Sequence, residues 1–259
     1  MKLLVTGGQG MVGSAVEGKN DEIIHLSRDN CNLLNKKQTH RLFSQLKPDG
    51  VIHCAGKVGG IGGNSNFKGE YFYNNLLINT NVIEASRLAG VKRLVAYLST
   101  CVFPDNVTYP LTIDQIHTGE PHSSNYPYAY AKRMADVRIR AYREQYGLNY
   151  TSIIPSNIYG PNDNFNLDHG HVMPMLIHKL YLAKKNNTDF TVWGSGKPLR
   201  EFIYSKDIAK ISKWILENYE GTDPLIISGD EEVSIKDLVD LLVQEFNFKG
   251  NVTFDSTKP

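Results

Sequence analysis

The stretch VTGGQGMVG, residues 5–13, places Gly7, Gly10 and Gly13 at a regular spacing directly after the apolar run KLLVT. The apolar run predicts a buried strand, and the glycines predict a tight turn into a helix over about residues 10–18. Such a turn lets the main chain approach a pyrophosphate, because the free N–H groups and the dipole of a helix N-terminus favour anions. We therefore interpret the stretch as a dinucleotide-binding turn that also includes Met11 and Val12.

Short apolar runs alternate with amphipathic runs as far as Gly160. Apolar strands separated by helices indicate a parallel sheet covered on both faces. The sequence therefore predicts a Rossmann-type doubly wound α/β fold. Strands are expected at 2–7, 22–27, 50–56, 93–100 and 150–160, and further helices at 36–46, 73–90 and 128–147.

The alternation of strands and helices ends after Gly160, where the polar, turn-rich segment PNDNFNLDHGH begins. Helices are expected at 172–185, 205–219 and 234–247, and a strand at 190–196. We expect a dinucleotide-binding domain over 1–160, with a return segment at about 200–222, and a smaller α/β substrate-binding lobe mainly over 161–259.

The composition narrows the classes of partner. The chain has 259 residues, 28 basic and 27 acidic, and a formal net charge of +1, so we expect no nucleic-acid partner. No apolar run approaches the roughly 20 residues of a membrane span, and the N-terminus does not resemble a signal peptide. Cys31, Cys54 and Cys101 lack the spacing of a metal site or disulfide scaffold, which favours the cytoplasm and no metal.

The end of the second expected strand favours one nicotinamide cofactor over the other. In dinucleotide-binding folds an acidic residue here binds a free ribose, whereas an arginine suits a 2′-phosphate. The segment HLSRDN places Arg28 before Asp29, so we expect NADP(H). Asn32 and Leu33 follow at the expected position of the adenine ring.

The segment YPYAYAKRM carries a tyrosine and a lysine one helical turn apart. Tyr128 and Lys132 stand at i and i+4, whereas Tyr126 and Tyr130 have no lysine at that spacing. A cation beside a phenol favours the phenolate, so Lys132 is expected to lower the pKa of Tyr128. Tyr128 could then exchange a proton with a carbonyl or alkoxide oxygen, although such a pair also arises by chance on an amphipathic helix.

With Ser99 at the end of the preceding strand, this pair resembles the Ser-Tyr-Lys site of extended short-chain dehydrogenases/reductases. Four further stretches resemble the GDP-L-fucose synthase family: 56–64, 98–104, 153–166 with 170–179, and 192–207. The resemblance implies conversion of GDP-4-keto-6-deoxy-D-mannose to GDP-L-fucose, by epimerisation at C3 and C5 and NADPH-dependent reduction at C4. It also implies a homodimer formed through residues 74–89 and 126–146.

The resemblance assigns the two proton-transfer residues of epimerisation. Cys101 matches the family's base and His171 its acid, on opposite faces of the sugar. Considered alone, Cys101 could be a small core side chain, as we expect for Cys31 and Cys54. His171 could merely cap a helix, and His169 is an alternative acid. The family's G-H-V-x-P motif, however, fits His171 and not His169.

Further residues follow from the resemblance. It implies that Lys132 contacts the nicotinamide ribose. It also implies that three residues of the substrate lobe contact the GDP-sugar, and that the sugar lies near Gly59 and Gly60. Two departures stand out: Gln9 replaces an arginine found in some members, and the family normally continues beyond Pro259 to complete the substrate lobe. The implied cofactor contacts are Ala55, Lys57, Tyr128, Lys132, Pro155, Asn157 and His171, and the implied substrate contacts are Lys179, Trp193 and Arg200.

Three alternatives remain open. A nucleotide-sugar 4,6-dehydratase would need an Asp-Glu pair after Thr100, where this chain has Cys101 and Val102. A UDP-sugar 4-epimerase would leave Cys101 and His171 unexplained. A cofactor-binding regulator without catalysis would not need Ser99, Tyr128 and Lys132.

Overall fold

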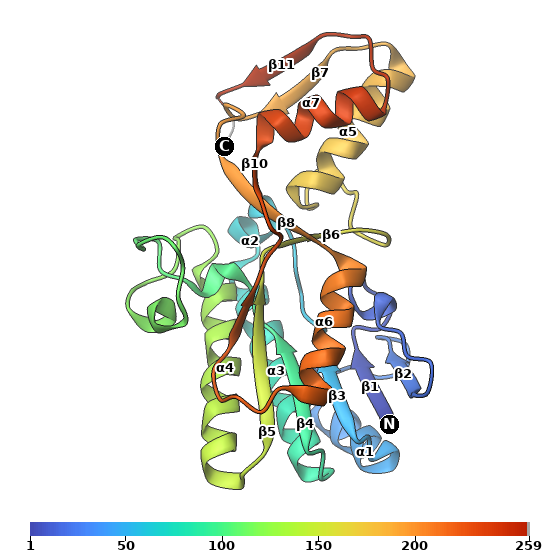
Figure 1. Cartoon of the computed structure of the whole chain (residues 1–259), viewed down its shortest axis with the longest axis vertical. Coiled ribbons are helices and arrows are strands. Elements are labelled where there is room, and N and C mark those ends of the chain that lie inside the picture. Colours follow the sequence, from blue (N-terminus) through green and yellow to red (C-terminus); the bar gives the residue numbers. More distant parts are fainter. Residues whose placement is uncertain (258–259) are drawn as a thin grey trace.

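The computed structural model describes residues 1–257, which form a large Rossmann domain with a smaller lobe above it in Figure 1. A six-stranded parallel sheet of order β2-β1-β3-β4-β5-β9 forms the centre of the large domain. This confirms the predicted Rossmann-type fold. The strands are β1 (Lys2–Thr6), β2 (Glu22–Leu26), β3 (Gly50–His53), β4 (Arg93–Tyr97), β5 (Asn149–Pro155) and β9 (Leu225–Ile227).

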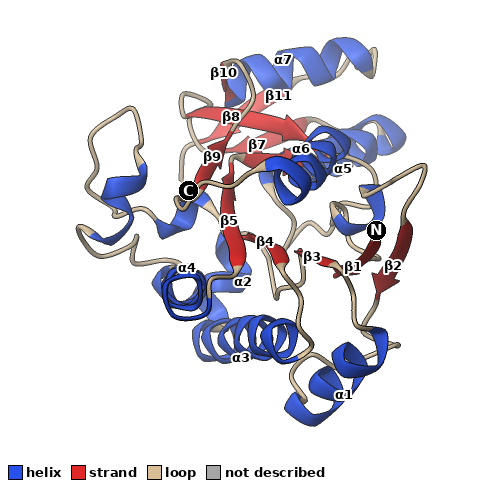
Figure 2. Ribbon diagram, turned by 60° about the horizontal axis from the view of Figure 1, so that its bottom comes forward, coloured by secondary structure: helices blue, strands red, loops and turns tan. Residues whose placement is uncertain are grey.

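Helices cover both faces of this sheet. Leu4 and its same-face neighbours pack towards α1 (Lys36–Leu46), α3 (Lys68–Leu88) and α4 (Tyr126–Tyr146). Leu3 and Val5 point to the opposite face, against α6 (Ser205–Asn218). Figure 2 shows this separation, with α1, α3 and α4 on one side of the strands and α6 on the other. Two apolar cores result because successive strand residues face opposite sides.

The smaller lobe has its own apolar core. Helices α5 (Val172–Asn186) and α7 (Ile235–Glu245) pack against β7 (Phe190–Trp193), which pairs in parallel with β11 (Val252–Asp255). A three-stranded sheet lies between the lobe and the large domain (Figure 1). Its order is β10 (Glu232–Ser234), β8 (Leu199–Tyr204) and β6 (Asn157–Tyr159).

The structure corrects two predicted elements. The helix expected over 10–18 is only the short 3-10 helix η1 (Gly13–Ala15), because Val16 is already extended and the chain enters β2 at Glu22. The single strand expected over 150–160 is two strands. Ser156 separates them: β5 lies in the central sheet, whereas β6 pairs with β8.

Two further observations concern the chain as a whole. The central sheet receives its last strand, β9, just beyond the return segment expected at about 200–222. Among the described residues, no helix is long and apolar enough to cross a membrane.

Candidate active site

The glycine turn is compact and packs against the end of β3. Gly7 has a φ of 71°, a left-handed conformation that glycine adopts without strain, and its carbonyl accepts a 2.9 Å hydrogen bond from Gly10 N. A side-chain carbon at Gly13 would collide with the Gly7 carbonyl oxygen, and one at Gly7 would lie 2.9 Å from Ala55 N. The turn therefore depends on close main-chain approach, although only a short 3-10 helix follows it.

A buried network of polar side chains connects the base of this turn to helix α4, which carries Tyr128 and Lys132. The Thr6 hydroxyl and His53 Nδ1 are 2.7 Å apart, and His53 Nε2 lies 3.0 Å from Asn79 Oδ1. Asn79 Nδ2 in turn donates to the Ala131 carbonyl at 3.3 Å. Burial, followed by the charge of nearby Lys132, lowers the pKa of His53 to about 3, so the imidazole is neutral within this network.

Tyr128 and Lys132 are both buried on α4. The Lys132 ammonium donates a 2.7 Å hydrogen bond to the Tyr97 carbonyl at the end of β4, and it lies 5.8 Å from the centre of the Tyr128 ring. Burial lowers the pKa of Lys132 to about 8. Burial also raises the pKa of Tyr128, so the expected lowering by Lys132 is wrong for this structure, because desolvation dominates and the ammonium bonds to a carbonyl.

Ser99 and Cys101 lie at the end of β4, beside Tyr128. Ser99 caps the short 3-10 helix η2 (Thr100–Val102), and its hydroxyl accepts a 3.3 Å hydrogen bond from Cys101 N. Burial raises the pKa of the Cys101 thiol, while the hydrogen bond with Ser99 lowers it. Cys101 also raises the pKa of Tyr128, and Ser99 lowers it. Tertiary structure therefore places a hydroxyl, a thiol and a phenol in one cluster.

A buried arginine attaches this cluster to α4. Arg133 Nε donates to the Val102 carbonyl at 2.7 Å, and its Nη1 donates to the Gly119 carbonyl at 2.8 Å. Val102 is the residue after Cys101, so Arg133 fixes the main chain that carries the thiol. It also holds the long loop between η2 and α4 against the same helix.

His171 lies at the N-terminus of α5 and is exposed. Its side chain makes no capping hydrogen bond, so the structure does not support a capping role. Burial raises the pKa of Asp163, and nearby His171 lowers it, which places the two side chains within electrostatic reach. The main chain of His169 accepts a 3.0 Å hydrogen bond from Gly60 N.

Tyr71 connects the Gly59–Gly60 loop to the cluster of Ser99, Cys101 and Tyr128. Its ring packs edge-on against Tyr128 with centroids 6.5 Å apart, and its hydroxyl lies directly against Gly59. Because Gly60 bonds to His169, the segment before His171 and the Tyr128 cluster meet the same loop from two sides. A side-chain carbon added at Gly59 would collide with the Tyr71 hydroxyl, and one added at Gly60 would collide with the Gly170 carbonyl oxygen.

Comparisons with known proteins agree with this geometry. The profile of the NAD dependent epimerase/dehydratase family matches residues 3–228. A GDP-L-fucose synthase from Dictyostelium discoideum is 49% identical over 265 residues, covering 99% of this chain and 83% of that protein. This chain belongs to the GDP-L-fucose synthase family. The resemblance inferred from the four sequence stretches is thereby confirmed.

Two further relatives support the same family membership. A GDP-L-fucose synthase from Escherichia coli strain K12 is 33% identical and covers 100% of this chain and 85% of that protein. A crystal structure of a GDP-L-fucose synthetase from Naegleria fowleri bound to NADP matches with a TM-score of 0.93 and 42% identity. The match covers 99% of this chain and 80% of that one.

The remaining predicted cofactor residues follow the carboxyl ends of the central strands. Arg28 and Asn32 are exposed after β2, whereas Leu33 packs against the apolar core. The Lys57 ammonium forms an ion pair with Glu70. Pro155 ends β5, and Asn157 Nδ2 donates to the Glu201 carbonyl at 3.0 Å.

Two of the three predicted substrate residues are in contact. The Lys179 ammonium lies 3.7 Å from the centre of the Trp193 ring, and burial lowers the pKa of Lys179. Arg200 is exposed on β8, and its Nη1 donates to the Leu199 carbonyl at 2.7 Å. Within residues 1–257, no recorded contact joins Arg200 to Lys179 or Trp193.

Two polar residues beside the candidate site, Asn125 and Asn75, were not predicted from the sequence. Asn125 Nδ2 donates to Cys101 Sγ at 3.0 Å. Asn75 is fully buried and exchanges two 2.9 Å hydrogen bonds with the main chain of Lys57. A signal existed for Asn75, because an asparagine inside an apolar helical segment needs buried partners. For Asn125, the sequence indicates only a common helix N-cap residue.

Proposed function

We propose that this chain converts GDP-4-keto-6-deoxy-D-mannose to GDP-L-fucose, by C3/C5 epimerisation followed by NADPH-dependent reduction of the C4 ketone. The observation that carries the proposal is the cluster of Ser99, Cys101 and Tyr128. Reduction needs a proton donor beside a carbonyl, and Tyr128 with Ser99 supplies it. Epimerisation also needs a base, and Cys101 stands beside the same donors.

The residues at the dinucleotide site fit NADP(H). Gly7 and Gly13 form a turn without side chains, which suits a pyrophosphate. Near the other end, the Ser156 hydroxyl is buried and has no hydrogen-bond partner among the described residues. It stands between Pro155 and Asn157, the residues assigned to the nicotinamide. We assign the 2′-phosphate to Arg28 and the nicotinamide ribose to Lys132.

Epimerisation uses the side chains of this chain alone. The Cys101 thiolate removes the proton α to the C4 carbonyl, and the electron pair of the C–H bond moves to the carbonyl oxygen. Tyr128 and Ser99 donate hydrogen bonds to this enolate oxygen, which lowers the barrier by holding the developing charge. His171 returns a proton to the carbon from the opposite face.

Reduction reuses the same donors. NADPH, when bound, supplies the hydride for C4. Tyr128 gives its proton to the resulting oxygen, and Ser99 orients that oxygen. The neutral, protonated state of Tyr128 suits an acid, since burial raises its pKa. The Lys132 ammonium, fixed by the Tyr97 carbonyl, keeps a positive charge near the phenol as it loses its proton.

The substrate lobe completes the proposal. We assign the GDP-sugar to the lobe formed by residues 161–259, with Lys179, Trp193 and Arg200 as contacts, and the cofactor to residues 1–160 with the return segment. The cation–π contact between Lys179 and Trp193 presents a charged edge suited to a diphosphate.

Incubation with GDP-4-keto-6-deoxy-D-mannose and NADPH tests the proposal. Absorbance at the reduced nicotinamide band should fall in step with formation of GDP-L-fucose, measured by chromatography. NADPH binding without oxidation would favour the cofactor-binding regulator and reject the synthase activity. Oxidation to a C4-reduced sugar with unchanged C3 and C5 would reject the epimerase half alone.

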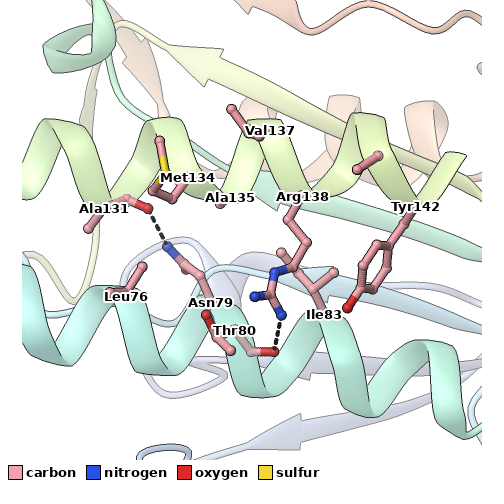
Figure 3. A pocket seen from close by; sticks show the side chains of 11 residues that line it. Leu76, Asn79, Thr80, Ile83, Ala131, Met134, Ala135, Val137, Arg138 and Tyr142 are labelled. Atoms are coloured by element: carbon pink, nitrogen blue, oxygen red, sulfur yellow. Dashed lines mark hydrogen bonds between the residues drawn. The ribbon is translucent and has the colours of Figure 1, made fainter. Parts of the chain in front are cut away.

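We also infer that α3 and α4 pair two copies of the chain. A groove runs between these helices, with Arg138 reaching across it to the Thr80 carbonyl at 3.3 Å (Figure 3). Phe72, Met134 and Val137 on this face are each more than one-third exposed. Exposed apolar side chains on two adjacent helices suit a self-complementary four-helix contact.

The three free cysteines support a reducing compartment, the cytoplasm.

A further inference from the structure

Asn125 occupies the N-cap position of α4 but does not cap it. Asparagine is among the best N-cap residues because its side-chain oxygen accepts from a main-chain N–H of the first turn. Asn35, at the N-cap of α1, does this through a 3.1 Å hydrogen bond from Gln38 N. Asn125 makes no capping hydrogen bond, although its residue type and position match.

The amide of Asn125 is instead directed at Cys101. Its Nδ2 donates to Cys101 Sγ at 3.0 Å. Its Oδ1 is buried and has no hydrogen-bond partner among the described residues. A buried amide oxygen without a partner is destabilising, as is a helix N-terminus without its cap. The missing cap is explained if the amide serves the thiol rather than the helix.

We propose that Asn125 is a positioning residue for Cys101, holding Sγ through Nδ2. The inference rests on the proposed role of Cys101 as the base. The thiol first loses its proton to solvent, and the thiolate then takes the proton from the substrate carbon. Asn125 exchanges no proton in either step. A hydrogen-bond donor to sulfur stabilises the thiolate and fixes its direction.

The groups around Cys101 that influence its pKa are neutral, so a neutral hydrogen-bond donor is what can stabilise its thiolate. Ser99, which precedes η2, and Tyr128 from α4 both interact electrostatically with the thiol. Ser99 lowers the pKa of Cys101, whereas burial raises it. Tyr128 is neutral, because its pKa is raised. The Asn125 amide therefore adds a neutral hydrogen-bond donor to the sulfur.

The decisive variants are Asn125→Asp and Asn125→Ala, and the readout is alkylation of Cys101 by iodoacetamide. Asp has nearly the size and shape of Asn and is equally favoured at the N-cap position, so Asn125→Asp keeps the fold. Its carboxylate cannot donate to sulfur and repels the thiolate. We expect alkylation of Cys101 near pH 8, followed by peptide mass spectrometry, to slow about tenfold or more in Asn125→Asp and somewhat less in Asn125→Ala.

Asn35→Ala is the matched control, because it removes a true cap far from the thiol. It should lower the melting temperature while the alkylation rate of Cys101 stays within about twofold of the wild type. A wild-type alkylation rate in Asn125→Asp, or faster alkylation in either Asn125 variant, would overturn the proposal.

Alkylation needs no substrate, so its result stands whether or not the chain proves to be a synthase. With substrate, solvent-deuterium incorporation at C3 and C5 should fall in Asn125→Asp by about the same factor as alkylation, while NADPH affinity measured by fluorescence stays unchanged. Normal deuterium incorporation together with slow alkylation would contradict the positioning role in catalysis.

Discussion

The ammonium of Lys132 donates a 2.7 Å hydrogen bond to the main-chain carbonyl of Tyr97. This contact joins helix α4 to the end of β4, two residues before Ser99. The lysine therefore holds the helix and the strand end in one geometry, in addition to placing a cation near Tyr128. Its burial makes the charge costly, and this cost gives a measurable pH dependence.

Lys132→Met should change how stability depends on pH. Burial lowers the pKa of Lys132 from 10.5 to about 8, so the unfolded state binds more protons between these values. Stability from this residue therefore rises as pH increases from 8 to 10.5, by up to about 3 kcal/mol. Urea unfolding of wild type and variant at about pH 8 and pH 10 measures the difference. Parallel changes in the two proteins would contradict the expectation.

His53→Gln should change stability on the acid side. Burial lowers the pKa of His53 from 6.5 to about 3, so the stability it contributes is complete above pH 6.5 and is lost as pH falls. At about pH 5 the wild type should lose about 2 kcal/mol more than His53→Gln, measured by urea unfolding. His122→Gln, at an exposed histidine, should lose stability as the wild type does.

Gly13→Ala should impair cofactor binding. The new methyl group would collide with the Gly7 carbonyl and displace the turn. We expect NADPH affinity, measured by fluorescence titration, to fall about tenfold or more, since the turn positions several N–H groups at once. Gly69→Ala is the control: nothing lies within 4 Å of its added carbon, so affinity should be unchanged. Equal affinities in both variants would count against the turn as the pyrophosphate site.

Cys101→Ser and Tyr128→Phe should separate the two reactions. Without the thiolate, solvent-deuterium incorporation at C3 and C5 should fall about 100-fold or more, as expected for loss of a general base. Tyr128→Phe should chiefly slow NADPH oxidation, because the proton for the C4 oxygen is missing. NMR of the sugar and absorbance of NADPH measure the two steps. Cys31→Ala, in the apolar core, should leave both rates near the wild type.

Normal deuterium incorporation in Cys101→Ser would show that another group is the base. His169 and His171 would then be tested by the same exchange measurement.

Met134→Glu should dissociate the inferred dimer. Met134 is 41% exposed and borders the α3–α4 groove, so two copies would each bury a new carboxylate against the other. Light scattering after size exclusion should show a dimer for the wild type and a monomer for the variant. Leu241→Glu, at a leucine 54% exposed on α7, should stay dimeric. A monomeric wild type would reject the inference.

Periodicity and residue spacing predicted most of the fold and the centre of the site. The helix expected at 36–46 is α1 itself, because its apolar positions recur at helical spacing. Tyr128 and Lys132 share a face of α4 because four residues complete one turn. The thiol of Cys101 had no such local pattern, and its meaning came from the family resemblance.

The sequence by itself determined the Rossmann alternation, the glycine turn, and the helix that carries Tyr128 and Lys132. These depend on contacts between residues close in the chain. Only the tertiary structure decided that β5 and β6 separate at Ser156, since strand partners lie far away in sequence. It also decided that burial raises the pKa of Tyr128 and that Asn125 faces Cys101 instead of capping α4. Desolvation and hydrogen-bond partners are set by distant segments packed around a residue, which local spacing does not record.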